Sequence, residues 1–501
     1  MAWAVRGLIE GFYGRPWTWD ERLLVLRHCA ERGMTDYVYA PKSEPRHRDR
    51  WREPYDAADL DGFARLVADS GVRVGFAISP GLSVDGSSAD DRAALAAKVD
   101  QVVATGVDLV CLAFDDLPWR PDAGPGHARL AAGLAEHLAG RATLVLVPTE
   151  YAGTSATPYL AAIAEGVPED VPVAWTGEAV VNDRVTAAQA RARAAALGGR
   201  APLLWDNYPV NDALMADRLH LGPLWGRDPA LADACCGYLA NPMVQPRASL
   251  LPLASAAAWL RGEDPVAAWL AEAGDLRTFA EACDGAVPAA LVQSLAGAVD
   301  GPGWQQAAAP LGRWLAAAAA CAAPGLEDEV GPWLAAVHRE AAVAAEALLL
   351  LQATRPVVTL AADGTGRVAP PDDDAAARHA FALLHEWPAL RRSEPQVMGV
   401  RRAVQPALGQ RADGRWAFLP GALLEDRNAV DALVRLAFRA VEGMAPPEAP
   451  VVTTDEEPVE VGEDGTFRVP PGATALARCG EVATLVRPPA GPPLGEPTTW
   501  G

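Results

Sequence analysis

Residues 4 to about 245 alternate short apolar runs with amphipathic segments, and this alternation constrains the fold more than any other feature of the chain. Alternation of this kind is typical of repeated strand and helix units. Seven apolar runs are strand candidates, with a short eighth one after them: 6–10, 36–40, 72–78, 107–114, 143–147, 173–175, 202–205 and Leu219–Leu221. Seven or eight such units in a row predict a (β/α)8 barrel, a ring of parallel strands surrounded by helices.

Each strand candidate is followed directly by a small cluster of polar, aromatic, Gly or Pro residues. Tyr13 follows the first run, Asp115-Asp116 the fourth and Asn207 the seventh. Because the carboxyl ends of the strands form the catalytic face of a barrel, the sequence predicts an active site at this face. A doubly wound sheet is the rival fold, but neither G-x-G-x-x-G nor G-x-x-x-x-G-K-S/T occurs in the chain.

Capping residues mark the helix boundaries in this part of the chain. Thr18, with Glu21 three positions later, predicts a helix start, and Gly33 predicts the end of that helix. Ser88 with Asp91 predicts a second capping box. We expect these helices to pack their apolar faces against the strands.

The composition changes after the predicted barrel, which occupies residues 1–245. Residues 246–355 are rich in Ala and Leu at helical spacing. One helix is expected to open with Asp264 as N-cap and Pro265 in its first turn. The pattern predicts an α-helical domain after the barrel.

The last part of the chain is less regular. We expect residues 356–445 to form a mixed, mostly helical region that opens with a hairpin-type turn at Asp363-Gly364. Residues 446–501 form a tail rich in Pro, Glu and Asp, with a β-hairpin expected at Asp464-Gly465. The predicted fold class is therefore α/β: a (β/α)8 barrel, an α-helical domain and a small mixed C-terminal region.

The charge of the chain excludes several kinds of partner. Its 501 residues include 43 basic and 64 acidic ones, and the net charge of −21 repels nucleic acids and anionic membrane surfaces. No basic segment followed by an apolar one stands at the start, so no secretory signal is visible. The best candidate for a membrane span, Trp314–Ala323, is well below the ~20 residues needed to cross a bilayer. We therefore expect a cytoplasmic protein that binds neither nucleic acid nor membrane.

The adjacent aspartates Asp115 and Asp116 indicate the chemistry. Two carboxylates this close do not ionise independently, so the pair supplies a proton donor beside a negative charge, as glycoside hydrolysis requires. A conventional retaining glycosidase has its acid and nucleophile about 5 Å apart on opposite sides of the bond, which neighbours on one strand do not easily provide. The pair therefore indicates that the nucleophile belongs to the substrate. A solvated turn or part of a metal site is the alternative for the dipeptide alone.

The other strand-end residues suit a neutral, hydroxyl-rich and bulky ligand. Four of them offer flat apolar faces for a pyranose ring: Tyr13, Tyr151, Trp175 and Trp205. Four more offer donors and acceptors for hydroxyl groups: Lys42, Asn207, Asp212 and Asn241. Each residue taken alone is more often structural, so it is their shared place after successive strands that predicts a sugar site.

Ten short motifs follow one another in the first half of the chain: RGLIEGFYGRPW (6–17), YAPK (39–42), WREPY (51–55), ISPG (78–81), FDD (114–116), PTEY (148–151), WTG (175–177), WDN (205–207), ND (211–212) and LGP (221–223). Their order resembles that of glycoside hydrolase family 84, the O-GlcNAcase and bacterial β-N-acetylglucosaminidase catalytic domain, sometimes labelled hyaluronidase. The resemblance implies a retaining enzyme without a cofactor, and a glycoconjugate with terminal β-linked N-acetylglucosamine as its partner.

The resemblance also implies a role for each matching residue. Asp115 would orient the substrate's 2-acetamido group, whose carbonyl oxygen attacks the anomeric carbon to form an oxazoline, and Asp116 would protonate the leaving oxygen and later activate water. Tyr151 would help to hold the acetamide oxygen, Asn207 would contact the acetamide pocket, and Trp205 would form its wall. The set that binds hydroxyl groups would be Gly11, Lys42, Asp212 and Asn241.

One departure from the family, two alternative functions and one open question accompany the resemblance. The lysine motif continues with Ser43-Glu44, where relatives commonly carry two aspartates, which affects the pocket rim and not the reaction. Metal catalysis would use Asp115, Asp116 and Asp212 as ligands, but the eight histidines lack H-x-x-x-H and H-E-x-x-H spacing. A non-catalytic protein that binds N-acetylglucosamine would usually lose the acid, whereas Asp116 is present. The sequence leaves open whether the helical domain pairs with a second subunit in a homodimer.

Overall fold

The structure is a computed structural model of the chain. It describes residues 3–487 except positions 4, 119, 121, 302, 391–394, 400–402, 405–406, 411–415, 420–422, 425–427, 443–450, 455–456, 463 and 480–481. The chain forms two compact units. Unit 1 comprises Met1–Arg277, Gly325–Val330 and Val404–Leu423, and unit 2 comprises Thr278–Pro324, Gly331–Ala403 and Leu424–Gly501.

Unit 1 contains an eight-stranded parallel sheet: β1 (Val5–Ile9), β2 (Asp36–Tyr39), β3 (Arg73–Ile78), β4 (Leu109–Ala113), β5 (Thr143–Val147), β6 (Ala174–Trp175), β7 (Leu203–Pro209) and β8 (Gly237–Asn241). The strand order is β5-β4-β3-β2-β1-β8-β7-β6. A parallel bridge between Leu146 and Val173 joins β5 to the segment that leads into β6, so the ring is nearly closed. The predicted (β/α)8 barrel is confirmed.

The eighth strand lies elsewhere than the sequence predicts. Leu219–Leu221 forms no strand, whereas β8 pairs with both β1 and β7. Leu219 and Leu221 are buried, so their apolar character reflects packing of a loop and not a place in the sheet. A Cβ on Gly237 would lie 2.8 Å from the carbonyl oxygen of Val5, so close strand approach requires glycine there. Because glycine has no apolar side chain, β8 does not stand out in the sequence as an apolar run.

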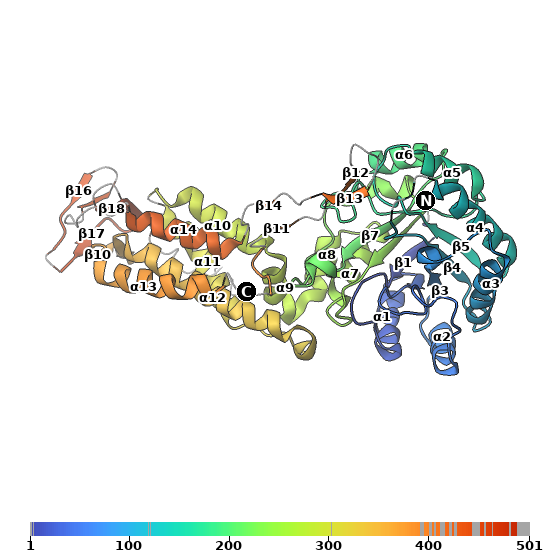
Figure 1. The fold of residues 1–501 in the computed structure, drawn as a ribbon. Coiled ribbons are helices and arrows are strands. Elements are labelled where there is room, and N and C mark those ends of the chain that lie inside the picture. Colours follow the sequence, from blue (N-terminus) through green and yellow to red (C-terminus); the bar gives the residue numbers. More distant parts are fainter. Residues whose placement is uncertain are drawn as a thin grey trace, which may run out of the picture. The chain divides into compact units, whose positions relative to one another are not determined.

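Helices surround the strands of unit 1, as Figure 1 shows for α1 to α6. They are α1 (Trp19–Glu31), α2 (Ala57–Asp69), α3 (Ala89–Val103), α4 (Ala123–Leu138), α5 (Pro158–Gly166), α6 (Ala187–Ala196), α7 (Leu250–Leu260) and α8 (Pro265–Ala273). Short 3₁₀ turns lie between them: η1 (Pro80–Leu82), η2 (Ala213–Met215), η3 (Pro229–Asp233) and η4 (Gly274–Leu276). Asp264 caps α8 as predicted, since its side chain accepts from the Val266 N–H.

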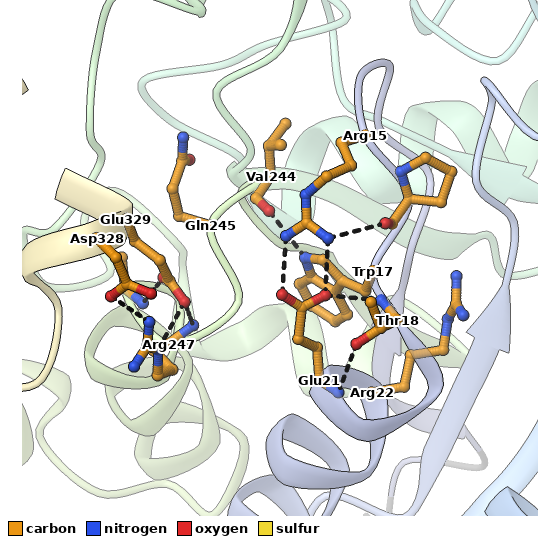
Figure 2. Close-up of polar contacts among 12 residues, drawn as sticks. Arg15, Trp17, Thr18, Glu21, Arg22, Val244, Gln245, Arg247, Asp328 and Glu329 are labelled. Atoms are coloured by element: carbon orange, nitrogen blue, oxygen red, sulfur yellow. Dashed lines mark hydrogen bonds and ion pairs between the residues drawn. The ribbon is translucent and has the colours of Figure 1, made fainter.

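The two predicted capping boxes differ in outcome. At α1 the Thr18 hydroxyl accepts from the Glu21 N–H, and the Glu21 carboxylate accepts from the Thr18 N–H (Figure 2). At α3 Ser88 accepts from the Asp91 N–H, but the Asp91 carboxylate accepts instead from Arg52 and the Asp85 N–H. The reciprocal half of the second box is therefore wrong, because a guanidinium competes for the same carboxylate.

Of the helices after the barrel strands, α7 and α8 lie in unit 1, whereas in unit 2 α10 packs against α11 and α14, and α13 packs against α14. The helices after α8 are α9 (Arg277–Asp284), α10 (Ala286–Ala298), α11 (Trp304–Ala319), α12 (Glu327–Ala353), α13 (Asp373–Leu390) and α14 (Ala429–Glu442). The first turn of α12 belongs to unit 1, where Arg247 donates to Asp328 and Glu329 (Figure 2). Among the described residues no helix has the length and apolar character to cross a membrane.

Small antiparallel sheets complete the fold. Three strands pair in the order β17-β10-β9 and four in the order β16-β15-β18-β19. Their bounds are β9 (Val357–Leu360), β10 (Thr365–Ala369), β15 (Val451–Thr454), β16 (Glu457–Val459), β17 (Thr466–Arg468), β18 (Ala475–Cys479) and β19 (Val482–Val486). Two further pairs are formed by β11 (Ala403–Val404) with β14 (Leu423–Leu424) and by β12 (Ala407–Gln410) with β13 (Trp416–Leu419). A barrel followed by helices and a small mixed region agrees with the predicted fold class.

Of the two predicted hairpin turns, one forms and one does not. Asp363-Gly364 joins the antiparallel strands β9 and β10. Asp464-Gly465 joins no hairpin, because β17 pairs with β10 and β16 pairs with β15. Each of these turns opens a D-G-T-x-R-V segment, at 363–368 and 464–469. The two segments lie side by side, with Thr365 opposite Arg468 and Arg367 opposite Thr466.

Candidate active site

The nine site residues that the family resemblance implies line one pocket of unit 1, at the carboxyl ends of the barrel strands, and the predicted aromatic residues Tyr13 and Trp175 line it too. The cavity has a volume of about 780 Å³. The nine residues are Gly11, Lys42, Asp115, Asp116, Tyr151, Trp205, Asn207, Asp212 and Asn241. A cavity of this size suits a small ligand such as a monosaccharide with part of its aglycone.

Asp115 is buried at the end of β4 and ion-paired with the ammonium group of Lys42. Its second carboxylate oxygen is also buried and has no hydrogen-bond partner among the described residues. A buried polar atom without a partner is uncommon, and this residue lines the pocket. This oxygen therefore keeps an unused acceptor site in a residue of the pocket lining.

Asp116 has different neighbours. The hydroxyl of Tyr13 donates to one of its carboxylate oxygens at 2.8 Å, and the hydroxyl of Tyr151 donates to the other at 2.8 Å. Burial, together with the negative charge of Asp116, raises the pKa of both tyrosines. Both phenols therefore stay protonated and act as donors at neutral pH.

Three side chains connect the opposite wall of the pocket. The Asn241 side chain accepts from the Gly11 N–H at 3.1 Å and donates to the Asn207 carbonyl oxygen at 2.9 Å. That same oxygen accepts from the Trp205 indole at 3.0 Å. A Cβ on Gly11 would lie 2.3 Å from the Trp205 ring, so only glycine permits this close approach. The wall is held by contacts between β1, β7 and β8.

Asp212 approaches the pocket from the loop after β7. Its carboxylate accepts from the Tyr13 N–H at 2.7 Å. Burial raises the pKa of Asp212, while that hydrogen bond opposes the change. Asp212 thus links the loop after β7 to the loop after β1.

Tyr13 has a role that the sequence did not indicate. The sequence marked it as an aromatic face, but the structure shows its hydroxyl on Asp116. Its position directly after the first strand is the only signal in the sequence, and it does not specify the partner. Further lining residues that the sequence missed include Leu117, Thr149, Val180, Val181 and Leu214.

Two buried ion pairs lie beside the pocket walls and were also missed. Glu10, next to Gly11, accepts from both Arg22 nitrogens at 2.7 and 2.9 Å and from the Tyr37 hydroxyl at 2.5 Å. The second pair repeats this pattern: Asp206 accepts from Arg227 at 2.8 and 2.6 Å and from the Tyr238 hydroxyl at 2.9 Å. Each pair is bidentate and satisfied by a tyrosine of a neighbouring strand, which fixes the backbone next to pocket residues.

The buried imidazole of His47 should make the folded protein less stable in acid. Burial, and next the positive charge of Lys42, lowers the pKa of His47 to about 3, and its Nδ1 donates to the Ala77 carbonyl at 2.9 Å. The unfolded chain takes up this proton near pH 6.5, whereas the folded chain does not, so stability falls as the pH drops from about 6.5 towards 3. The slope per histidine is at most about 1.4 kcal/mol per pH unit.

His47→Gln should lessen this pH dependence. Between pH 6.5 and 5, we expect the variant to lose about 2 kcal/mol less free energy of unfolding than the unchanged protein. Denaturant titrations at both pH values measure the difference, with the exposed His385→Gln as control. An unchanged slope in His47→Gln would contradict the prediction.

Comparison with known proteins gives the family. The model of the beta-N-acetylglucosaminidase family (NAGidase) matches residues 6–288, which is more than half of the chain. The proteins called Protein O-GlcNAcase from Rattus norvegicus and Mus musculus are each 31% identical over 273 residues, or 51% of this chain. The match covers 30% of the length of each of these relatives.

Solved structures share the fold. A mutant O-GlcNAc hydrolase of Thermobaculum terrenum has a TM-score of 0.71 at 23% identity, and the match covers 88% of this chain and 96% of that one. The protein CpGH84B also has a TM-score of 0.71 at 23% identity, covering 87% of this chain and 77% of that one. The resemblance to glycoside hydrolase family 84 is confirmed, and with a family match over more than half of its residues the chain belongs to the beta-N-acetylglucosaminidase family.

Proposed function

We propose that the protein is a retaining β-N-acetylglucosaminidase, of the O-GlcNAcase type, that hydrolyses terminal β-linked N-acetylglucosamine by substrate-assisted catalysis. One observation carries this proposal: two adjacent carboxylates reach the same pocket with different partners. Asp115 is paired with Lys42 and keeps one free oxygen, whereas Asp116 is bound by two tyrosine hydroxyls. Different surroundings allow two neighbouring carboxyl groups to take different roles.

The first step uses the free oxygen of Asp115. This oxygen would accept from the N–H of the substrate's acetamide, which turns the acetamide carbonyl oxygen towards the anomeric carbon. That oxygen attacks, the bond from the anomeric carbon to the leaving oxygen breaks, and an oxazoline forms. Asp115 stabilises the positive charge that develops on the acetamide nitrogen, and Lys42 holds the aspartate in place.

Asp116 would move the protons. In the first step it gives a proton to the leaving oxygen, and in the second it takes one from the water that opens the oxazoline. The attack by the substrate and the attack by water each invert the anomeric carbon, so the configuration is retained. The Tyr13 and Tyr151 hydroxyls fix the orientation of this carboxyl group.

The remaining pocket residues would bind the sugar. Tyr151 and Asn207 would contact the acetamide group against the Trp205 ring. Gly11, Asp212 and Asn241 would meet the sugar hydroxyls, together with Lys42. A Cβ at Gly11 would meet the Trp205 ring, so a larger residue there would displace this wall of the pocket.

We also propose that the catalytic barrel corresponds to residues 1–245, the α-helical domain to 246–355, the mixed, mostly helical region to 356–445 and the tail to 446–501. All pocket residues come from strands and loops before position 245, which supports a catalytic unit containing these residues. The helices α7 and α8, which follow position 245, lie with the barrel in unit 1. The cytoplasmic location and the homodimer stay predictions from the sequence. They need localisation and solution-mass measurements, respectively.

Replacing the substrate's acetamide by a hydroxyl should nearly abolish turnover. The aryl glucoside keeps the ring and the leaving group but lacks the internal nucleophile, so the effective molarity of the acetamide oxygen, ~10⁵ M or more for a well-oriented group, is lost. The measurement compares kcat/KM for the aryl N-acetylglucosaminide and the aryl glucoside. Unchanged turnover of the glucoside would exclude substrate assistance, and binding without turnover of either would favour a non-catalytic sugar-binding protein.

A second panel identifies the aglycone. It compares the aryl N-acetylglucosaminide with an O-modified peptide, chitobiose and hyaluronan at equal concentration. The strongly negative chain should disfavour hyaluronan, which is a polyanion. Preference for hyaluronan would contradict that expectation without affecting the proposed reaction.

A further inference from the structure

The backbone at Asp115 and Asp116 departs from that of a strand. Successive side chains of an extended strand point to opposite faces, so two consecutive aspartates would not normally enter one pocket. Here both line the same cavity. Asp116 has a φ of 54°, in the left-handed region, and this turn brings its side chain to the same side as that of Asp115.

The left-handed conformation needs support. It costs roughly 1–2 kcal/mol for a residue with a Cβ, although aspartate tolerates it better than most. The conformation persists only where surrounding contacts define it, and such residues cluster at functional sites. The contact that supports it comes from Arg48, in the segment between β2 and α2.

Arg48 binds the two carbonyls of this turn. One guanidinium nitrogen donates to the Asp116 carbonyl at 2.9 Å, and the other donates to the Asp115 carbonyl at 3.5 Å. Arg48 is buried, so these bonds compete little with water. Thr149 fixes the chain on the preceding side, because its hydroxyl donates to the Phe114 carbonyl at 2.7 Å.

Arg48 is itself held in place. The neighbouring residue, His47, accepts from the Ser79 N–H through its carbonyl at 2.9 Å, and its ring donates to the Ala77 carbonyl. The segment is thereby attached to β3 on its way from β2. The nearby Arg52 differs, since its two nitrogens bind the Asp91 carboxylate at 2.8 and 2.6 Å.

We propose that Arg48 is a positioning residue for the proton donor Asp116. It holds the backbone of Asp115 and Asp116 in the turn that directs both carboxyl groups into the pocket. This inference rests on the proposed function, because it requires Asp116 to be the acid. In the described structure Arg48 donates to the backbone carbonyls of Asp115 and Asp116, so it acts on the substrate through the direction of the Asp116 side chain. Its positive charge also acts to lower the pKa of Tyr13, although burial and Asp116 raise that pKa overall.

The test uses Arg48→Met and Arg48→Lys in the full chain, with aryl N-acetylglucosaminides whose leaving groups range from activated to poor. We expect Arg48→Met to lose about 10- to 100-fold in kcat/KM on the poorest leaving groups, as small misplacement of a catalytic group does, and only a few-fold on the most activated ones. Lysine can reach one carbonyl, so Arg48→Lys should recover part of the loss and keep an intermediate dependence on the leaving group.

Arg52→Met is the matched control. Arg52 lies in the same segment as Arg48 but binds Asp91 and not Asp115 or Asp116. Its substitution should therefore lower kcat/KM equally for all leaving groups, or not at all. The inference is wrong if both Arg48 variants lose kcat/KM equally for all leaving groups, or if neither variant loses any. If Arg48→Met fails to fold, Arg48→Lys alone decides, with its melting temperature measured beside its leaving-group dependence.

The failure of this inference can be told from failure of the proposed function. Asp116→Asn is measured on the same substrates. If Asp116→Asn shows the leaving-group dependence and the Arg48 variants do not, only the role of Arg48 is wrong. If Asp116→Asn shows none, the assignment of the acid itself is wrong.

Discussion

Asp116→Asn should lower the turnover of substrates with poor leaving groups by about 10²- to 10⁴-fold, the usual contribution of a general acid, and leave activated aryl glycosides much less affected. The reason is chemical: a leaving oxygen of low basicity departs without a proton, whereas a basic one does not. Asparagine tolerates the left-handed backbone at position 116 and still offers an oxygen to a tyrosine hydroxyl. The substitution therefore removes the proton and places an amide nitrogen, in place of an oxygen, opposite one of the two tyrosine hydroxyls.

The measurement is the dependence of kcat/KM on the pKa of the leaving group in both proteins. Asp212→Asn provides the comparison within the same pocket, because Asp212 meets the Tyr13 backbone and not the position of the leaving oxygen in the proposed mechanism. The decrease of kcat/KM in Asp212→Asn should be similar for all leaving groups. A uniform loss in Asp116→Asn as well would remove the proposed acid role.

Arg22→Met should lower the free energy of unfolding of unit 1 by about 3–5 kcal/mol, because it leaves the Glu10 carboxylate buried without its cation. The side chains of Arg22 and Glu10 are 4% and 0% exposed, so water cannot replace the guanidinium. Within the described part of the chain, the Glu10 carboxylate would keep the hydrogen bonds from the Tyr37 hydroxyl and the Trp17 N–H. Since Glu10 precedes Gly11, we also expect weaker binding of the sugar.

Arg15→Met is the control that the chain itself offers. Arg15 makes an equally bidentate pair with Glu21, at 2.9 and 2.8 Å, a few residues before Arg22 (Figure 2). Its side chain is 55% exposed, and a pair of this kind contributes roughly 0–1 kcal/mol. Denaturant unfolding of both variants compares the two pairs.

The double variant Glu10→Gln with Arg22→Met separates two explanations. It removes the uncompensated charge, so it should be more stable than Arg22→Met alone. Equal effects of Arg15→Met and Arg22→Met would show that burial does not govern the strength of these pairs.

Much of the barrel followed from local patterns. Six apolar runs correspond to β1 to β6, and the seventh run, 202–205, corresponds to the start of β7. These strands were recognisable because strands buried on both faces are continuously apolar and end at polar clusters. The eighth strand did not follow, since Gly237 and Ala240 carry little apolar character and gain their place by pairing with β1 and β7. The partner of β17 did not follow either, because the sequence predicts a local hairpin at Asp464-Gly465, whereas β17 pairs with β10, about a hundred residues earlier.

The composition of the pocket was largely predictable as well. A parallel barrel brings the carboxyl ends of all strands to one face, so residues after successive strands must lie near one another. That rule places Asp115, Lys42 and Asn207 in one cavity without any knowledge of distances. The family resemblance added roles, which stay proposals until the substitutions are measured.

The sequence by itself determined which side chains gather at the catalytic face, because strand periodicity and barrel topology need only local information. The tertiary structure alone decided how those side chains are paired: the free oxygen of Asp115, the two tyrosine hydroxyls on Asp116 and the guanidinium of Arg48 behind them. These contacts join residues up to 103 positions apart. Their geometry depends on loop conformations and on a left-handed turn, which no periodicity of the sequence encodes.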